Sequence, residues 1–315
     1  MALHIAHRIQ NLPNYPFVEI SAQVNRLQAA GHDVIRMDMG SPDLPPPLEV
    51  RQKLAELVMS DAGHGYTGYR GLPAFRQAVA RYYERTFGVH LDPDTEVLPL
   101  IGSKEGLVNA TLALVGPGDS VLVPSLSYPA YAMGALLAEA EVCELEVNAT
   151  GGYLADLSQV PTEVAQSARL LWVNYPHNPT GALASVQDYT TAVEFCRANN
   201  LLLMSDNPYF AVVFEGQAPV SALQAPGARE VTVEFMSLSK SHNMAGWRLG
   251  AAVGQAEAIA ALLQVKSNVD SGTLARFTRL ASLRWTTRRK PGLMNVTRTI
   301  ASAATFCSRP CQTWA

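Results

Sequence analysis

The most informative part of the chain is Met236-Ser-Leu-Ser-Lys-Ser-His-Asn-Met-Ala-Gly-Trp-Arg-Leu-Gly250. It places Lys240 among small hydroxyl side chains, and Arg248 follows eight residues later. Residues 230–236 alternate enough to predict a buried strand before the lysine, and residues 249–253 predict another strand after it. A lysine in a turn between buried strands is costly unless it is paired, deprotonated or covalently used.

The side chains around Lys240 suggest one such use. Serine hydroxyls and a guanidinium can together hold a phosphate dianion. A lysine that can form a covalent link beside a phosphate site is what pyridoxal 5′-phosphate requires. The alternative is a solvated loop lysine whose neighbouring serines only cap a helix. This stretch alone leaves both interpretations open.

A second motif, Leu201-Leu-Leu-Met-Ser-Asp-Asn-Pro-Tyr209, is an apolar strand that ends on Asp206. A carboxylate at the C-terminal end of a strand lies where α/β sheets bind their ligands. An aspartate that faces a pyridinium nitrogen keeps that nitrogen protonated and makes the ring an electron sink. Tyr209 could donate a hydrogen bond to the phenolate oxygen of the same cofactor. The two motifs together favour the cofactor interpretation.

Three motifs now occur in order: N-Y-P-H-N-P-T-G at 174–181, S-D-N-P-Y at 205–209, and the lysine stretch. In this order they resemble the class I/II aminotransferases of fold type I. The resemblance covers roughly residues 10–273. Within the family, V-L-P-L-I-G-S-K-E-G and V-K-S-N-V-D-S-G look most like the LL-diaminopimelate aminotransferase branch, whose relatives include aspartate and alanine aminotransferases.

The chain's own pattern agrees with the α/β fold that this resemblance implies. Strands alternate with helices across residues 97–253, which predicts a mostly parallel sheet with helices on both faces. The run G-S-K-E-G at 102–106 opens a helix whose free amides suit an anion. It is not the dinucleotide-binding motif G-x-G-x-x-G, so a nicotinamide enzyme is disfavoured.

The resemblance also implies roles for individual residues. The residues implied to be catalytic are Lys240, Asp206 and Tyr209. The residues implied to bind pyridoxal 5′-phosphate are Ser103, Lys104, Tyr128, Asn178, Asp206, Tyr209, Ser237, Ser239, Lys240, Arg248 and Tyr66. The residues implied to bind the substrate are Gly40, Tyr15 and Asn178. Tyr128 is preferred to Tyr131 as the aromatic ring that stacks on the cofactor.

The implied partners are an amino acid and a 2-oxo acid, with LL-diaminopimelate or an aspartate- or alanine-like donor and 2-oxoglutarate. A donor of that kind would place the enzyme in lysine biosynthesis. In the family, the tyrosine that matches Tyr66 reaches the phosphate of a neighbouring subunit, so a homodimer is expected. Turn or surface roles for Gly40 and Tyr66 are the alternatives.

Composition fits a cytoplasmic enzyme. Apolar residues make up 48% and charged residues 16% of the 315-residue chain, which predicts a large buried core. The four cysteines have no metal or disulfide spacing, which suits a reducing compartment. The sequence shows no signal-peptide core and no apolar run of spanning length. We expect no metal, no membrane and no nucleic acid.

Residues 274–315 differ from the rest of the chain. They contain eight Lys/Arg residues and no Asp or Glu. Such a segment fits either a basic tail or a chain read in the wrong frame. A shifted reading can give W-L-D-E-R-N-A-Y-Y-R-E-R-R-D, which resembles the W-x-x-x-R-N-x-x-Y-x-x-R-R-D helix of the family's C-terminal domain. We therefore interpret the segment as the product of a frameshift.

The expected organisation is an N-terminal segment over residues 1–45, which is part of a small domain, and a large cofactor-binding domain over residues 46–273. An aberrant basic tail over residues 274–315 replaces the rest of the small domain, so the small domain is incomplete. Two alternatives to an active aminotransferase follow: an impaired, truncated relic that binds the cofactor, and a pyridoxal-phosphate-dependent carbon–sulfur lyase.

Overall fold

The computed structural model describes residues 3–61, 63–214 and 216–273. The predictions about the basic segment, residues 274–315, lie outside the described residues. No helix in the described part of the chain is both long enough and apolar enough to cross a membrane.

A seven-stranded sheet forms the centre of the molecule, with strand order β1-β7-β6-β5-β4-β2-β3. Its strands are β1 (Val97–Leu100), β2 (Ser120–Pro124), β3 (Glu141–Leu145), β4 (Ala168–Asn174), β5 (Leu202–Asp206), β6 (Thr232–Ser237) and β7 (Gly250–Gly254). The neighbours from β3 through β6 pair in parallel, whereas β7 pairs antiparallel with both β6 and β1. The predicted mostly parallel sheet is confirmed.

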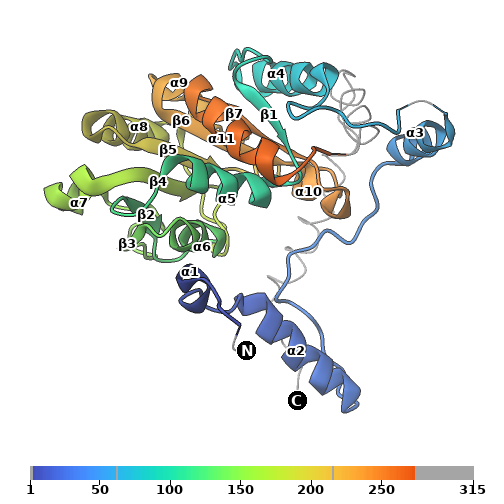
Figure 1. Ribbon diagram of the computed structural model, residues 1–315, viewed down its shortest axis with the longest axis horizontal. Helices are drawn as coiled ribbons and strands as arrows, with labels where there is room; N and C mark the ends of the chain where they lie inside the picture. The colour runs from blue at the N-terminus through green and yellow to red at the C-terminus, as the bar shows by residue number, and fades with distance from the viewer. Residues whose placement is uncertain (1–2, 62, 215, 274–315) are drawn as a thin grey trace.

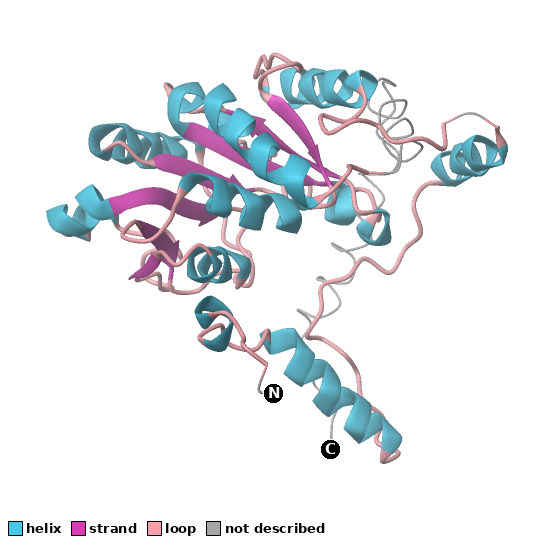
Figure 2. Ribbon diagram, in the orientation of Figure 1, coloured by secondary structure: helices cyan, strands magenta, loops and turns pink. Residues whose placement is uncertain are grey.

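Helices cover both faces of this sheet (Figures 1 and 2). On one face lie α5 (Ser103–Leu114), α6 (Ala130–Leu137) and α11 (Ala256–Val269). On the other face lie α4 (Pro73–Phe87), α8 (Val186–Asn199), η2 (Ala222–Gln224) and α9 (Ala228–Val231). Shorter elements complete this body: η1 (Leu157–Gln159), α7 (Thr162–Ser167), α10 (Leu238–Ser241) and η3 (Ala245–Trp247).

Strand β4 shows why the sequence reads as continuous apolar runs. Leu171 and Val173 pack into the core with α4 and α8, whereas Leu170 and Trp172 pack into the core with α5, α6 and α11. Because successive side chains of a strand point to opposite faces, a sheet covered on both faces buries all of them. The alternation of apolar and polar residues that marks a strand with one exposed face is therefore weak in this sequence.

The C-terminal ends of three parallel strands place polar residues side by side. Asn174 ends β4, Asp206 ends β5 and Ser237 ends β6. Asn174 is paired in register with Asp206, and Asp206 is paired with Phe235, two residues before Ser237. In α/β proteins this edge of the sheet is where ligands bind. The fold thus brings the three motifs of the sequence together.

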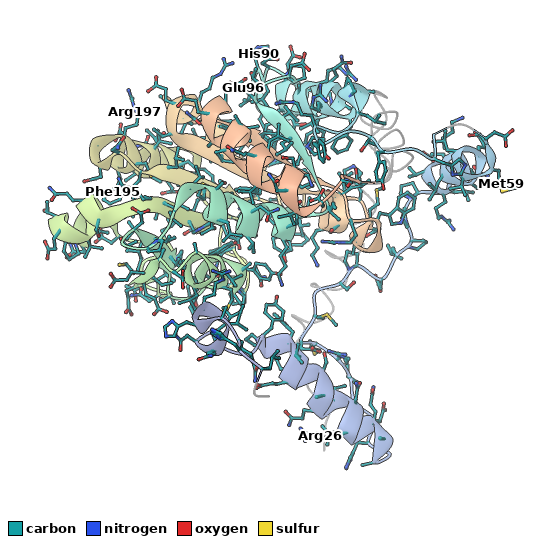
Figure 3. All side chains as sticks on the ribbon, viewed as in Figure 1. Arg26, Met59, His90, Glu96, Phe195 and Arg197 are labelled. Carbon is teal, nitrogen blue, oxygen red and sulfur yellow. The ribbon has the colours of Figure 1, made fainter. Side chains whose placement is uncertain are left out.

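The N-terminal segment extends away from this body, although its first helix lies next to α6 and Tyr15 contacts Tyr128 (Figure 1). It contains α1 (His7–Gln10) and α2 (Pro16–Ala29), and an extended stretch leads from there to α3 (Leu48–Met59). Figure 3 places Arg26 and Met59 on these outlying helices, away from the sheet. Residues 33–43 have the sequence pattern of a short strand followed by a turn, which predicts a strand near residues 33–39. This prediction is wrong: no strand forms there, and Met37 is 89% exposed.

Candidate active site

One cavity at the C-terminal edge of the sheet collects nearly all the predicted site residues. Its volume is about 390 Å³. The predicted residues that line it are Tyr15, Gly40, Ser103, Lys104, Tyr128, Asn178, Asp206, Tyr209, Ser237, Ser239, Lys240 and Arg248. Tyr66 does not line the cavity, and its side chain is 90% exposed.

Lys240 is held over the cavity by the short helix α10. Strand β6 ends at Ser237, and the hydroxyl of Ser237 accepts a hydrogen bond from the backbone N–H of Ser239, which caps α10. Lys240 follows one residue later, and its Nζ donates to the backbone carbonyl of Gly40. Burial lowers the pKa of the Lys240 amine, and the Arg248 guanidinium lowers it further. This lysine is thus easier to deprotonate than a free one.

The positively charged side chain of Arg248 lies beside the first turn of α5, which begins at Ser103. Arg248 has a left-handed backbone with a φ of 54°, and its Nη1 donates to the carbonyl of Ala245 at 3.0 Å. Gly102 has a φ of 73°, and a Cβ at that position would lie 2.1 Å from Nη2 of Arg248. The positive φ and the close approach of the guanidinium both favour glycine here, and the free amides of α5 and the guanidinium form a site that suits an anion.

Asp206 is buried at the floor of the cavity, with 4% exposure. Its Oδ2 accepts a hydrogen bond from the hydroxyl of Tyr131 at 2.7 Å. Its Oδ1 is buried as well but has no hydrogen-bond partner among the described residues. Burial raises the pKa of Asp206 to about 7, and the bond from Tyr131 opposes that rise. A buried acceptor without a donor is costly, so this oxygen is suited to a ligand.

Asn174 is a residue that the sequence analysis missed, although its position carried a signal. Its Nδ2 donates to the backbone carbonyl of Asp206 at 2.6 Å, and its Oδ1 accepts from the backbone N–H of Asn178 at 2.8 Å. It ends β4 as Asp206 ends β5. A polar residue at the end of an apolar strand is the sequence signal that points to Asn174 as a site residue. The resemblance to the family points only to Asn178 in the same motif.

Two tyrosines and a lysine form the aromatic side of the cavity. Tyr15 donates its hydroxyl hydrogen to the hydroxyl of Tyr128 at 3.2 Å, across a separation of more than 100 residues in sequence. The Nζ of Lys104 lies 3.8 Å from the centre of the Tyr15 ring and 5.7 Å from that of Tyr128. These are cation–π distances. The N-terminal segment therefore contributes directly to this site.

Tyr131, the alternative to Tyr128 as the ring that stacks on the cofactor, lies in the core and not in the cavity wall. Its side chain has 0% exposure and is not among the residues that line the cavity, whereas Tyr128 is. Of the two rings, only that of Tyr128 is therefore available to a ligand in the cavity, and its stacking role stays a prediction. Tyr131 instead reaches the site through its hydroxyl on Asp206.

Comparisons with known proteins place this arrangement in a family. The family model "Aminotransferase class I and II" matches residues 32–309. The chain is 47% identical over 270 residues to the LL-diaminopimelate aminotransferase of Dehalococcoides mccartyi strain 195, covering 86% of this chain and 70% of the relative. It is 46% identical over 267 residues to the enzyme of that name from Moorella thermoacetica, covering 85% and 68%.

Solved structures with the same fold agree. The apo form of BacF from Bacillus subtilis superposes with a TM-score of 0.93 at 34% identity, over 99% of this chain and 79% of that one. The N-succinyldiaminopimelate aminotransferase of Mycobacterium tuberculosis gives a TM-score of 0.85 at 27% identity, over 97% and 77%. The chain belongs to the class I and II aminotransferases, a family of pyridoxal-phosphate-dependent transaminases.

Proposed function

We propose that this chain binds pyridoxal 5′-phosphate in the cavity at the C-terminal edge of the sheet and transfers the amino group of LL-diaminopimelate to 2-oxoglutarate. The observation that carries the proposal is the convergence of Lys240, the unpartnered oxygen of Asp206 and the guanidinium of Arg248 on one cavity. The choice of donor rests on the 47% identity to an LL-diaminopimelate aminotransferase.

The residues present fit this cofactor. The buried Oδ1 of Asp206 lacks a donor, and a protonated ring nitrogen would supply one. The guanidinium of Arg248 packs against Gly102 beside the free amides of α5, and this cationic part of the cavity suits a phosphate. Lys240 supplies an amine whose pKa is lowered by burial and by Arg248, as a covalent lysine requires. All three features belong to the same cavity.

We assign a separate role in the reaction to each of Lys240, Asp206 and Tyr209. Bound pyridoxal phosphate supplies a carbonyl carbon for the amino group and a ring that accepts electrons. The Nζ of Lys240 takes the proton from the α-carbon of the donor amino acid as general base. In the second half of the reaction it delivers a proton, as general acid, to the α-carbon of the amino acid formed from the 2-oxo acid. Asp206 holds the proton at the ring nitrogen. Tyr209 donates to the phenolic oxygen, because burial raises the pKa of Tyr209 to about 12 and keeps it protonated.

The remaining predicted residues bind and orient. Asn178 would share the phenolic oxygen of the bound cofactor with Tyr209, and Tyr128 would pack against its ring; all three line the cavity. The residues proposed to hold the phosphate are Ser103, Lys104, Ser237, Ser239 and Arg248. Alignment of the α-carbon with the ring depends on a fixed substrate carboxylate, for which we propose Gly40, Tyr15 and Asn178. Lys240 must first leave the carbonyl of Gly40, to which it donates in this structure.

We also propose a homodimer and a two-part chain. Residues 46–273 act as the cofactor-binding domain, and residues 1–45 act as part of a small domain. Tyr66 serves the site of a second copy, since its side chain is 90% exposed and lies outside the cavity of its own chain. In a twofold dimer each copy would then complete the other's site.

The proposed reaction has a direct test. The purified full chain, loaded with pyridoxal phosphate, should form glutamate from 2-oxoglutarate with LL-diaminopimelate as donor. We expect a kcat/KM at least about tenfold higher than with aspartate or alanine, a difference of about 1.4 kcal/mol in transition-state binding. Turnover of a sulfur amino acid without any oxo acid would instead indicate a carbon–sulfur lyase. Cofactor binding without turnover of any donor would indicate the truncated relic.

Shared sites predict complementation between two defective variants. Tyr66→Phe and Lys240→Ala chains should each be poorly active as homodimers. After mixing and subunit exchange in equal amounts, random pairing should give a native set of residues at roughly a quarter of the sites. The measurement is transaminase activity of the mixture against that of the two separate proteins. Activity no higher than their average would contradict the shared site.

A further inference from the structure

Tyr131 holds one oxygen of Asp206 from inside the core. It lies in the first turn of α6, its side chain has 0% exposure, and its hydroxyl donates to Oδ2 of Asp206 at 2.7 Å. Its ring makes no part of the cavity wall. Tyr131 therefore contacts this cavity-lining carboxylate without lining the cavity itself, and the proposed cofactor roles do not explain that contact.

The ring of Tyr131 is itself fixed in place. It stacks on the indole of Trp172 with the centroids 4.8 Å apart and the planes 8° from parallel. Trp172 also has 0% exposure, and its ring lies 5.7 Å from that of Phe235, the residue paired in register with Asp206. Because side chains in a close-packed core have no room to change rotamer freely, the hydroxyl of Tyr131 has one available direction.

The polar atoms of Asp206 differ in whether they have a hydrogen-bond donor. The backbone carbonyl accepts from Nδ2 of Asn174 at 2.6 Å, which holds the end of β5. Oδ2 is held by Tyr131, and Oδ1 is left without a partner. Asp206 is thus held at its backbone carbonyl and at Oδ2, and of its two carboxyl oxygens only Oδ1 has no donor among the described residues. A rigid support behind a ligand-binding group is the arrangement that sets its direction precisely.

We propose that Tyr131 is a positioning residue: its hydroxyl fixes Asp206 so that Oδ1 alone serves the cofactor's ring nitrogen. This inference rests on the proposed function, because it assigns Asp206 to that nitrogen. Tyr131 acts only through Asp206 and touches no ligand itself.

The electrostatics of the pair support a one-way hydrogen bond. Burial, and then the negative charge of Asp206, raise the pKa of Tyr131 well above the ordinary value for tyrosine, so the phenol stays protonated and donates. The same bond lowers the pKa of Asp206 against the effect of burial. The titratable groups around this carboxyl are Tyr128, Tyr131, Tyr209, Lys240 and, across the sheet, Glu234.

The test is Tyr131→Phe in the full chain, which removes the hydroxyl and keeps the ring stacked on Trp172. In the cofactor-free protein, carbon-13 NMR of labelled aspartate, assigned with Asp206→Asn, should show the pKa of Asp206 rising by about one pH unit. The dissociation constant of pyridoxal phosphate should rise about tenfold. Tyr189→Phe is the matched control, since it removes a buried hydroxyl from the opposite core, bonded to the carbonyl of Tyr175 at 3.4 Å.

A double-mutant cycle separates positioning from mere packing. In the Asp206→Asn background, Tyr131→Phe should change the dissociation constant less than about twofold, because the group through which it acts is gone. An equal loss in both backgrounds, or an unchanged pKa of Asp206 in Tyr131→Phe, would overturn the positioning role. Unchanged cofactor affinity in Asp206→Asn alone would instead count against the proposed function.

Discussion

Replacing Lys240 with alanine will abolish transamination while leaving the fold intact. Lys240 is the residue proposed to move the proton at the α-carbon, and no other lysine among the described residues lining the cavity except Lys104 could replace it. The Nζ of Lys104 is engaged with the ring of Tyr15 at 3.8 Å. We expect a fall in kcat on the order of 10⁴-fold, at the upper end for loss of a general acid–base group.

The chemical identity of the lysine can be checked in the same experiment. Borohydride reduction of the cofactor-loaded wild-type chain should fix pyridoxal phosphate on the peptide that contains Lys240, as mass spectrometry would show. Lys104→Ala is the control, because it removes a second amine from the same cavity and should leave the label on Lys240. A label on Lys104 in the wild-type chain would contradict the assignment, whatever the activity.

The position of the candidate cavity could be predicted from the sequence because several of its residues, among them Asp206 and Ser237, lie at strand ends. A polar residue that closes an apolar strand of a parallel sheet is carried to the ligand-binding edge, whatever the details of packing. That rule placed Asp206 correctly, and it would also have found Asn174. The lysine stretch followed the same logic, with Lys240 three residues beyond the end of β6.

The partners of buried groups could not be predicted in this way. Glu234 sits within an apolar strand with 0% exposure, and it accepts hydrogen bonds from the hydroxyls of Tyr83, Ser205 and Ser221 at 2.7–3.0 Å. It also accepts from the backbone N–H of Ala222 at 2.8 Å. These donors come from three separate segments, and no local pattern joins them. The hydroxyl of Tyr131 on Asp206 is hidden for the same reason.

The error at residues 33–39 has a different physical origin. The alternation of apolar side chains there is real, with Ile35 at 82% and Met37 at 89% exposure. A strand, however, also needs a neighbour for its backbone groups, and no strand of the described residues pairs with this stretch. Periodicity predicts which face would be buried, but it does not supply the partner.

The largest effect on stability is expected from Lys266→Met. Lys266 lies on α11 with 1% exposure, and its Nζ contacts Asp270 at 2.8 Å and Glu105 of α5 at 3.4 Å. Removing the ammonium leaves two carboxylates without their cation in a poorly hydrated place. Loss of one partner from a buried ionic group typically costs about 3–5 kcal/mol. The midpoint of urea unfolding of the cofactor-free protein should fall accordingly.

The effect should depend on pH with a definite sign. Burial raises the pKa of Glu105, and Lys266 opposes that rise, so the variant will raise it further. Between the unfolded and the raised folded value, the native state then binds more protons than the unfolded one, and stability falls as pH rises. The deficit of Lys266→Met relative to wild type should therefore be largest near neutral pH and shrink toward pH 5.

A matched surface pair separates this effect from ordinary charge removal. The Nζ of Lys53 lies 2.6 Å from Oε2 of Glu56 on the same helix, α3, but the two side chains are 47% and 63% exposed. Lys53→Met should change stability by less than about 1 kcal/mol. Adding Glu105→Gln and Asp270→Asn to Lys266→Met should recover part of the loss, because the uncompensated charges are then gone. If Lys266→Met unfolds like Lys53→Met, or the triple variant recovers nothing, the buried ammonium does not stabilise the contact between α11 and α5.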